Sequence, residues 1–124
     1  MENKKVIATA IHPVTKTDIV IYEQTWTSHA KTNHTELGDC GHGQDCLNEV
    51  VETLNNPHII REGRNPLTEE LFVRYTEQVE FGIYKGFSVS TRKEDDVTFM
   101  TTAYHDEINS SKGKVIYKKG DKNE

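Results

Sequence analysis

The sequence has no long apolar run. Its longest, around residues 19–21, is far shorter than the roughly 20 residues that a membrane-spanning helix needs. The first residues, Met-Glu-Asn-Lys-Lys, do not begin the apolar stretch of a signal peptide. We therefore expect a chain that neither spans a membrane nor is exported by a signal peptide, and the predicted location is cytoplasmic.

Several catalytic signatures are also absent, namely a glycine-rich phosphate loop, a nucleophile elbow and a zincin motif. An excess of positive charge is missing too, since 15 Lys and Arg face 20 Asp and Glu for a net charge of −5. A protein that coats nucleic acid needs a broad basic field, so this class is disfavoured. Residues 1–60 hold 4 basic and 8 acidic side chains and residues 61–124 hold 11 and 12, which leaves room for a local basic patch in the second half.

Cysteine is scarce, with two residues at Cys40 and Cys46. Without a secretion signal, a structural disulfide is the less favoured interpretation, and we expect a glycine-rich loop with two incidental thiols. A zinc site formed by His34, Cys40, His42 and Cys46 is the alternative, because these side chains are zinc ligands. Their spacing fits no familiar zinc finger, so the prediction is that the protein holds no metal and no cofactor.

What is present fits one small domain. The chain has 124 residues, about the size of a single domain, and we expect residues 1–120 to form it and 121–124 to be a polar tail. Period-two alternation and β-branched residues predict strands. The predicted strands cover residues 6–11, 18–23, 71–76, 84–92 and 97–104, with short extended segments at 58–60 and 115–117. A polar turn at residues 93–96 links the last two long strands.

Two helices are predicted. The clearer one spans residues 45–54, begins with Asp45 as its N-cap and ends before Pro57. Its apolar side chains recur at i, i+3, i+4 and i+7, which makes one stripe: Leu47, Val50, Val51 and Leu54. The other helix occupies the first part of residues 25–37, with Thr25 or Thr27 as its cap.

The predicted fold class is therefore α+β, with an N-terminal β-hairpin followed by two helices packed on an antiparallel sheet of about four strands. The helix at 45–54 covers the apolar face of this sheet. In residues 97–104, strict alternation puts Thr98, Met100, Thr102 and Tyr104 on one side and the intervening residues on the other. The uncovered face of the sheet is expected to show these side chains: Arg74, Ser88, Ser90, Thr102 and Tyr104.

Two histidines and a set of cations are candidates for chemistry. His29 and His34 lie about 140° apart around a helix, so they do not converge on one metal, but either suits proton transfer near neutral pH. Cations interleaved with aromatics on strands suit phosphate pairing and base stacking. They are Arg61, Arg64, Arg74, Lys85, Arg92 and Lys93, with Tyr75, Tyr84 and Phe87. From composition alone, a solvated sheet face is the favoured interpretation.

The order of several short motifs resembles the phage-associated ribonuclease-like domains of the superfamily that unites barnase, EndoU, the colicin tRNA nucleases and RelE. The first motif is a helix carrying Trp26, His29 and His34, followed by Glu36 and Leu37. The later motifs are an Asn-Pro step at 56–57, strands at 72–75 and 87–90, Thr-Ala-Tyr at 102–104 and Lys-Gly at 112–113. The similarity covers residues 18–118.

The resemblance implies a metal-independent endoribonuclease, in which the ribose 2′-OH attacks the adjacent phosphate. By this resemblance His34 is the general acid or base, His29 shares that role or orients the site, and Arg74 neutralises the phosphorane. Thr102 and Tyr104 hold non-bridging oxygens. RNA on either side of the cut is held by Arg61, Tyr84 and Lys85.

Partners and alternatives follow from the same interpretation. A toxin of this type implies RNA as substrate and an immunity or antitoxin protein as partner, with no membrane partner and no inferred preference for DNA. The main alternative is a catalytically inactive RNA- or protein-binding domain on the same scaffold. A zinc-stabilised binding domain is the third interpretation.

Overall fold

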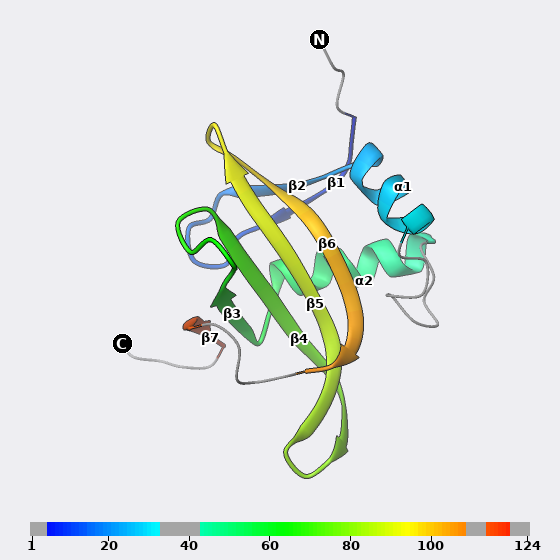
Figure 1. Ribbon diagram of the computed structural model, residues 1–124, viewed down its shortest axis with the longest axis vertical. Helices are drawn as coiled ribbons and strands as arrows, with labels where there is room; N and C mark the ends of the chain where they lie inside the picture. Colours follow the sequence, from blue (N-terminus) through cyan, green and yellow to red (C-terminus); the bar gives the residue numbers. More distant parts are fainter. Residues whose placement is uncertain (1–4, 33–42, 109–113, 120–124) are drawn as a thin grey trace.

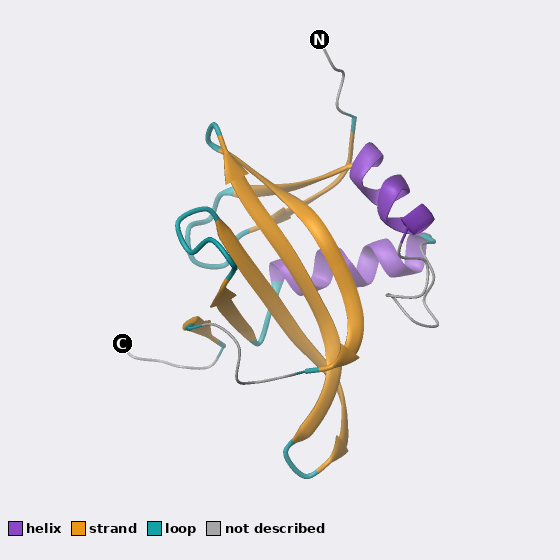
Figure 2. Cartoon of the chain, in the orientation of Figure 1, coloured by secondary structure: helices purple, strands orange, loops and turns teal. Residues whose placement is uncertain are grey.

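A computed structural model describes residues 5–32, 43–108 and 114–119 of the chain. Strands dominate these residues (Figure 2). The elements, in chain order, are β1 (Val6–Ile11), β2 (Asp18–Tyr22), α1 (Glu23–Thr32), α2 (Gln44–Asn55), β3 (Ile59–Glu62), β4 (Glu69–Glu80), β5 (Ile83–Glu94), β6 (Val97–Glu107) and β7 (Val115–Lys118).

The seven strands form one curled sheet in the order β1-β2-β6-β5-β4-β3-β7, and α2 lies across one of its faces (Figure 1). The predicted α+β fold, with a separate hairpin and two helices packed on an antiparallel sheet of about four strands, is therefore wrong. The described residues are mostly β, in a single sheet of seven strands with two short helices. The β1–β2 hairpin joins the sheet because β2 pairs in parallel with β6 through Ile19 and Thr98. At the other edge β3 pairs with β4 and β7 pairs with β3. Such pairings between distant segments leave no mark in local periodicity.

The two helices form close to where they were predicted, but their starts differ. α2 begins at Gln44 after Gly43, whose position makes no side-chain capping hydrogen bond, so Asp45 is not the N-cap. Asp45 lies in the first turn, where the helix dipole still favours a carboxylate. α1 begins at Glu23, ahead of both predicted caps, and the Glu23 amide donates to the carbonyl of Lys5. The predicted helical residues beyond 32 lie outside the described ranges.

The core lies between α2 and the sheet. Val50 and Leu54 of the predicted stripe are fully buried, and Leu47 nearly so. They pack in one cluster with Phe72 of β4, Val89 of β5 and Ala103 of β6. These three residues stand opposite one another across the strands and form a row. We call the side of the sheet that carries this row the α2 face, and the opposite side the outer face.

A β-bulge in β6 decides which side chains reach which face. Ser90 pairs with Thr102 but Thr91 pairs with Met100, so Thr101 is an extra residue on β6. The bulge lets Met100 and Ala103 both enter the core, although strict alternation predicts them on opposite sides. Thr102 and Tyr104 consequently stay on the outer face, as predicted, while Met100 does not accompany them.

The turns have the geometry that their residues favour. Asp95 and Asp96 both have positive φ, at 52° and 67°, as a two-residue hairpin turn that matches strand twist requires. This confirms the predicted polar turn at residues 93–96. Among the described residues, no helix has the length and apolar character that crossing a membrane requires.

Candidate functional site

The outer face carries two rows of side chains in register across four strands. In one row Arg61, Leu71, Ser90 and Thr102 stand opposite one another, and in the next Ile59, Val73, Ser88 and Tyr104 do the same. Directly opposite residues in an antiparallel sheet lie about 4.5–5.5 Å apart at Cα. The serine, threonine and tyrosine hydroxyls of β5 and β6 are therefore neighbours, and they lie two and three strands from Arg61 on β3.

An aromatic row continues this face toward the end of the β4–β5 hairpin. The rings of His58 and Tyr75 have centroids 5.1 Å apart, and those of Tyr75 and Tyr84 are 4.9 Å apart. The ring planes are tilted by 32° and 36°. Such offset contacts are favourable for π-systems and leave ring faces and edges available to a ligand.

Main-chain bonds fix His58 in this row. The Tyr75 amide donates to His58 Nδ1 over 3.0 Å, and the His58 amide donates to the carbonyl of Val73 over 2.8 Å. The Lys119 amide donates to the His58 carbonyl over 2.8 Å. Since Nδ1 accepts a hydrogen bond, the neutral ring carries its proton on Nε2, which makes that atom a donor.

The electrostatics keep both central rings uncharged. Burial lowers the pKa of His58 below its usual value, and the positive charges of Lys119 and Arg74 lower it further, so His58 is neutral at pH 7. Burial raises the pKa of Tyr75, with the nearby Arg61 charge acting in the opposite sense. Tyr75 therefore keeps its hydroxyl proton, and Arg61 is a cation close to the aromatic row.

Four of the predicted site residues share the outer face: Arg61, Tyr84, Thr102 and Tyr104. Arg61 is 6% exposed, so its charge lies within this face rather than above it. The structure thus brings together the predicted hydroxyls with one predicted cation and one predicted stacking residue.

Arg74 does not belong to this face, which corrects its predicted place beside Thr102 and Tyr104. Its Nε donates to Thr53 Oγ1 over 3.1 Å, and its Nη2 donates to the Glu49 carbonyl over 3.2 Å and pairs with the Glu49 carboxylate. The guanidinium lies 5.5 Å from the Phe87 ring centroid. Arg74 alternates with Val73 and Tyr75, so it points to the opposite side and ties β4 to α2.

Lys85 is separated from Tyr84 for the same reason. Successive side chains of a strand point to opposite faces, and Lys85 lies two residues from Phe87 of the core. We therefore place Lys85 on the α2 face of the sheet, and not with Tyr84 as predicted.

Other candidates fall partly or wholly outside the described residues. His29 lies on α1, but its side chain is outside the description, as are His34, Cys40 and His42. Cys46 is disulfide-bonded, contrary to the expected incidental thiol, so it has no thiolate to offer zinc. Within the described ranges, no group of three or more His, Cys, Asp or Glu side chains could hold a metal ion.

Sequence reasoning gave no site role to His58. It follows the Asn-Pro step, which marked the end of a helix and one motif of the resemblance. Tyr75 was listed among the stacking aromatics but was expected on the face opposite Thr102 and Tyr104, and its contact with Tyr84 depends on how β4 and β5 pair near their turn. Two register shifts occur there, between Tyr75 and Glu77 and between Gln78 and Glu80. Alternation alone cannot predict them.

Comparison of the chain with protein-family models, with curated proteins and with solved structures gives no match.

Proposed function

We propose that this protein binds single-stranded RNA on its outer face and cleaves it as a metal-independent endoribonuclease. The observation that supports the proposal best is the aromatic row His58–Tyr75–Tyr84 on the same face as Arg61, Thr102 and Tyr104. Sheet surfaces that combine stacking rings with cations and hydroxyls suit unpaired nucleotides, because every base has a π-face.

Each part of the face has a role in this proposal. Tyr75 and Tyr84 stack on bases, and the His58 Nε2–H donates to a base or phosphate oxygen. Thr102 and Tyr104 donate their hydroxyl protons to non-bridging phosphate oxygens. The Arg61 charge stabilises the negative charge that develops on the phosphorane, a role that Arg74 cannot fill while it bonds to α2.

The residues that transfer protons are assigned by the resemblance to the superfamily of barnase, EndoU, the colicin tRNA nucleases and RelE. By that resemblance His34 removes the 2′-OH proton or protonates the leaving 5′-oxygen, and His29 assists. The 2′-oxygen then bonds to phosphorus, the bond from phosphorus to the 5′-oxygen breaks, and a 2′,3′-cyclic phosphate forms with a free 5′-hydroxyl. No metal takes part in this scheme.

The second candidate function is RNA binding without cleavage. It is favoured by one observation: the only arginine assigned to the phosphorane by resemblance, Arg74, faces α2. Both functions predict binding, and only the first predicts strand scission.

The test uses purified full-length protein on total RNA in EDTA, with His34→Ala as the matched variant. The nuclease proposal predicts fragments with 2′,3′-cyclic phosphate ends from the wild type and none from His34→Ala, with both proteins binding RNA equally. Binding without fragments from either protein selects the second function. Absence of binding and of fragments contradicts both.

Location and partner stay predictions. A disulfide at Cys46 is typical of an oxidising compartment, which argues against the predicted cytoplasmic location. An inhibitor protein of the immunity or antitoxin kind remains the partner expected of a toxin.

The control substrate for the cleavage assay is a DNA strand of the same sequence as an RNA that is cut, because DNA lacks the 2′-OH that the reaction needs.

A further inference from the structure

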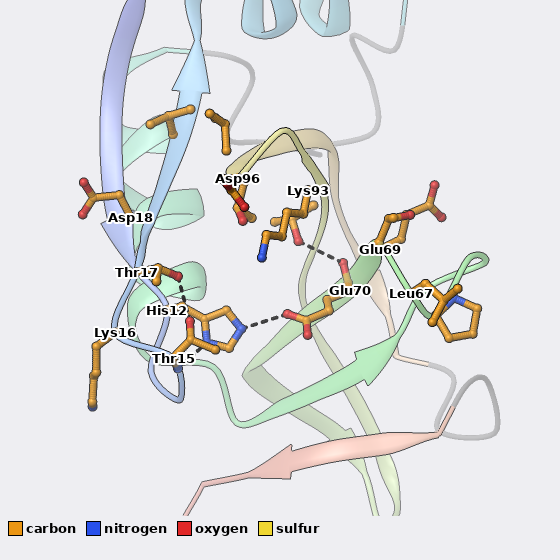
Figure 3. Close-up of a pocket in the computed structure, with 16 residues that line it drawn as sticks. His12, Thr15, Lys16, Thr17, Asp18, Leu67, Glu69, Glu70, Lys93 and Asp96 are labelled. Carbon is orange, nitrogen blue, oxygen red and sulfur yellow. Dashed lines mark hydrogen bonds and ion pairs between the residues drawn. The ribbon is translucent and has the colours of Figure 1, made fainter.

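A cleft at one end of the sheet lies away from the outer face. Its walls are the β1–β2 connection, the β3–β4 connection and the β5–β6 turn, and its volume is about 680 Å³ (Figure 3). This is within the range of small-molecule sites. We call it the end cleft, and the proposed RNA function makes no use of it.

His12 holds two walls of the end cleft in place. His12 is 6% exposed, and its Nδ1 accepts hydrogen bonds from the amides of Val14 at 3.1 Å and Thr15 at 3.3 Å. The ring proton is therefore on Nε2, which donates to Glu70 Oε1 over 2.8 Å. This chain of bonds fixes the β1–β2 connection to β4 and orients one oxygen of the Glu70 carboxylate.

The third wall is fixed by the main chain. The Lys93 amide donates to the Thr68 carbonyl over 2.8 Å, which ties the β5–β6 turn to the β3–β4 connection. Asp96 has the positive φ that the tight turn needs. The end cleft is thus a pre-organised space, and a ligand entering it would not have to order its walls.

Charges of both signs face this space. The Lys93 ammonium points into the end cleft toward His12 and Glu70, and Asp96 lies beside it on the same turn (Figure 3). No ion pair joins Lys93 or Asp96 to another residue that the structure describes. The Glu70 carboxylate bonds to the His12 ring through one oxygen. A ligand that complements this arrangement must itself carry a positive and a negative group a short distance apart.

We propose that the end cleft binds a free α-amino acid. Its carboxylate pairs with the Lys93 ammonium, and its ammonium pairs with the Asp96 and Glu70 carboxylates. The hydroxyls of Thr17, Thr68 and Thr98 on the same walls supply further hydrogen bonds. The cleft volume leaves room for a side chain of substantial size beyond the two charged groups.

The experiment measures binding of each common L-amino acid to the full chain by ligand-observed and amide NMR. At least one is expected to bind with a Kd below about 1 mM and to shift the Thr68 and Lys93 amides. Its decarboxylated amine and its deaminated acid should each bind at least about tenfold more weakly. An amine or acid that binds as well as its parent amino acid overturns the proposal, and so does the absence of binding by all of them.

Substitutions distinguish direct ion pairs between the amino acid and the cleft from a general effect of the protein's charge. Lys93→Gln and Asp96→Asn should each weaken binding by at least about tenfold, and Asn tolerates the positive φ at position 96. Lys16→Gln is the matched control, because Lys16 borders the same cleft but points away from it (Figure 3). It should leave Kd unchanged, and equal weakening by Lys16→Gln and Lys93→Gln would contradict the assigned geometry. Thermal melting confirms that each variant is folded.

Discussion

The rings of Tyr75 and Tyr84 stack across the β4–β5 hairpin with their centroids 4.9 Å apart. Neither ring belongs to the core beneath α2. On our account this pair is a platform for bases, so Tyr75→Leu and Tyr84→Leu should each weaken binding of single-stranded RNA about tenfold, since stacking contributes about 1–3 kcal/mol per base. Fluorescence anisotropy with a labelled RNA measures the change.

The control for the stacking pair is Phe81→Leu. Phe81 is 96% exposed at the turn of the same hairpin, beyond the aromatic row. It should leave the RNA affinity unchanged. Weakening by Phe81→Leu equal to that of the tyrosine variants would show that the hairpin tip, not the row, contacts RNA.

Replacing Arg74 should lower the stability of the fold and leave the affinity for RNA unchanged. Arg74→Gln removes hydrogen bonds that join β4 to Thr53 and Glu49 of α2, and it should lower the free energy of unfolding by about 1–3 kcal/mol. Urea titration measures this loss. Arg92→Gln breaks ion pairs of an exposed arginine and should change stability little. RNA affinity that falls with Arg74→Gln while stability is kept would restore Arg74 to the binding face.

The structure shows which side-chain orientations the alternation along a strand predicts correctly. Alternation groups Val73 with Tyr75 and Ser88 with Ser90 correctly, because β4 and most of β5 are regular. It does not show how the two strands are paired: Arg74 was expected on the face of Ser88 and Ser90, whereas the register puts Val73 opposite Ser88. It fails at Met100, because the bulge at Thr101 shifts the later part of β6 by one residue. No local sequence signal marks that extra residue.

The site was predictable to a similar extent. Arg61, Thr102 and Tyr104 meet on one face. Alternation predicted this face for Thr102 and Tyr104, whereas Arg61 was a candidate only through the resemblance. Arg74 was misplaced because the β4–β5 register puts it opposite Phe87 of the core. Its guanidinium therefore reaches Thr53 and Glu49 of α2. The number of strands was misjudged for a different reason. The parallel pairing of β2 with β6 joins residues about 80 positions apart, and only the folded chain reveals it.

Acidification should destabilise the protein through His58. Its pKa is lowered in the folded state, so the unfolded chain binds the proton more readily. The stability is therefore complete above the usual histidine pKa of about 6.5 and falls as the pH drops below it. In His58→Asn the amide oxygen can replace Nδ1 as the acceptor for the Tyr75 amide, without titrating.

Melting temperatures of wild type and His58→Asn between pH 8 and pH 5 measure this effect. The difference between the two curves isolates His58 from the other five histidines. The wild type should lose more stability than His58→Asn on acidification, and parallel curves would contradict the assignment.

Gly86 should be intolerant of any side chain. A Cβ at this position would lie 2.1 Å from the Arg74 carbonyl oxygen, where β4 and β5 approach next to Tyr75. Gly86→Ala must push the two strands apart and should lower the free energy of unfolding by roughly 3 kcal/mol or more. Gly43→Ala is the control, since a Cβ there meets no atom within 4 Å and the backbone is extended. Similar stability of the two variants in urea titration would contradict the close approach.

The most direct test of the central claim is an NMR titration of the isotope-labelled chain with a short single-stranded RNA. We predict that the largest amide shifts map to outer-face positions: Arg61, Tyr75, Tyr84, Ser88 and Thr102. Shifts confined to α2 or to the end cleft, or no shifts at RNA concentrations of about 1 mM, would contradict the claim that the outer face binds RNA.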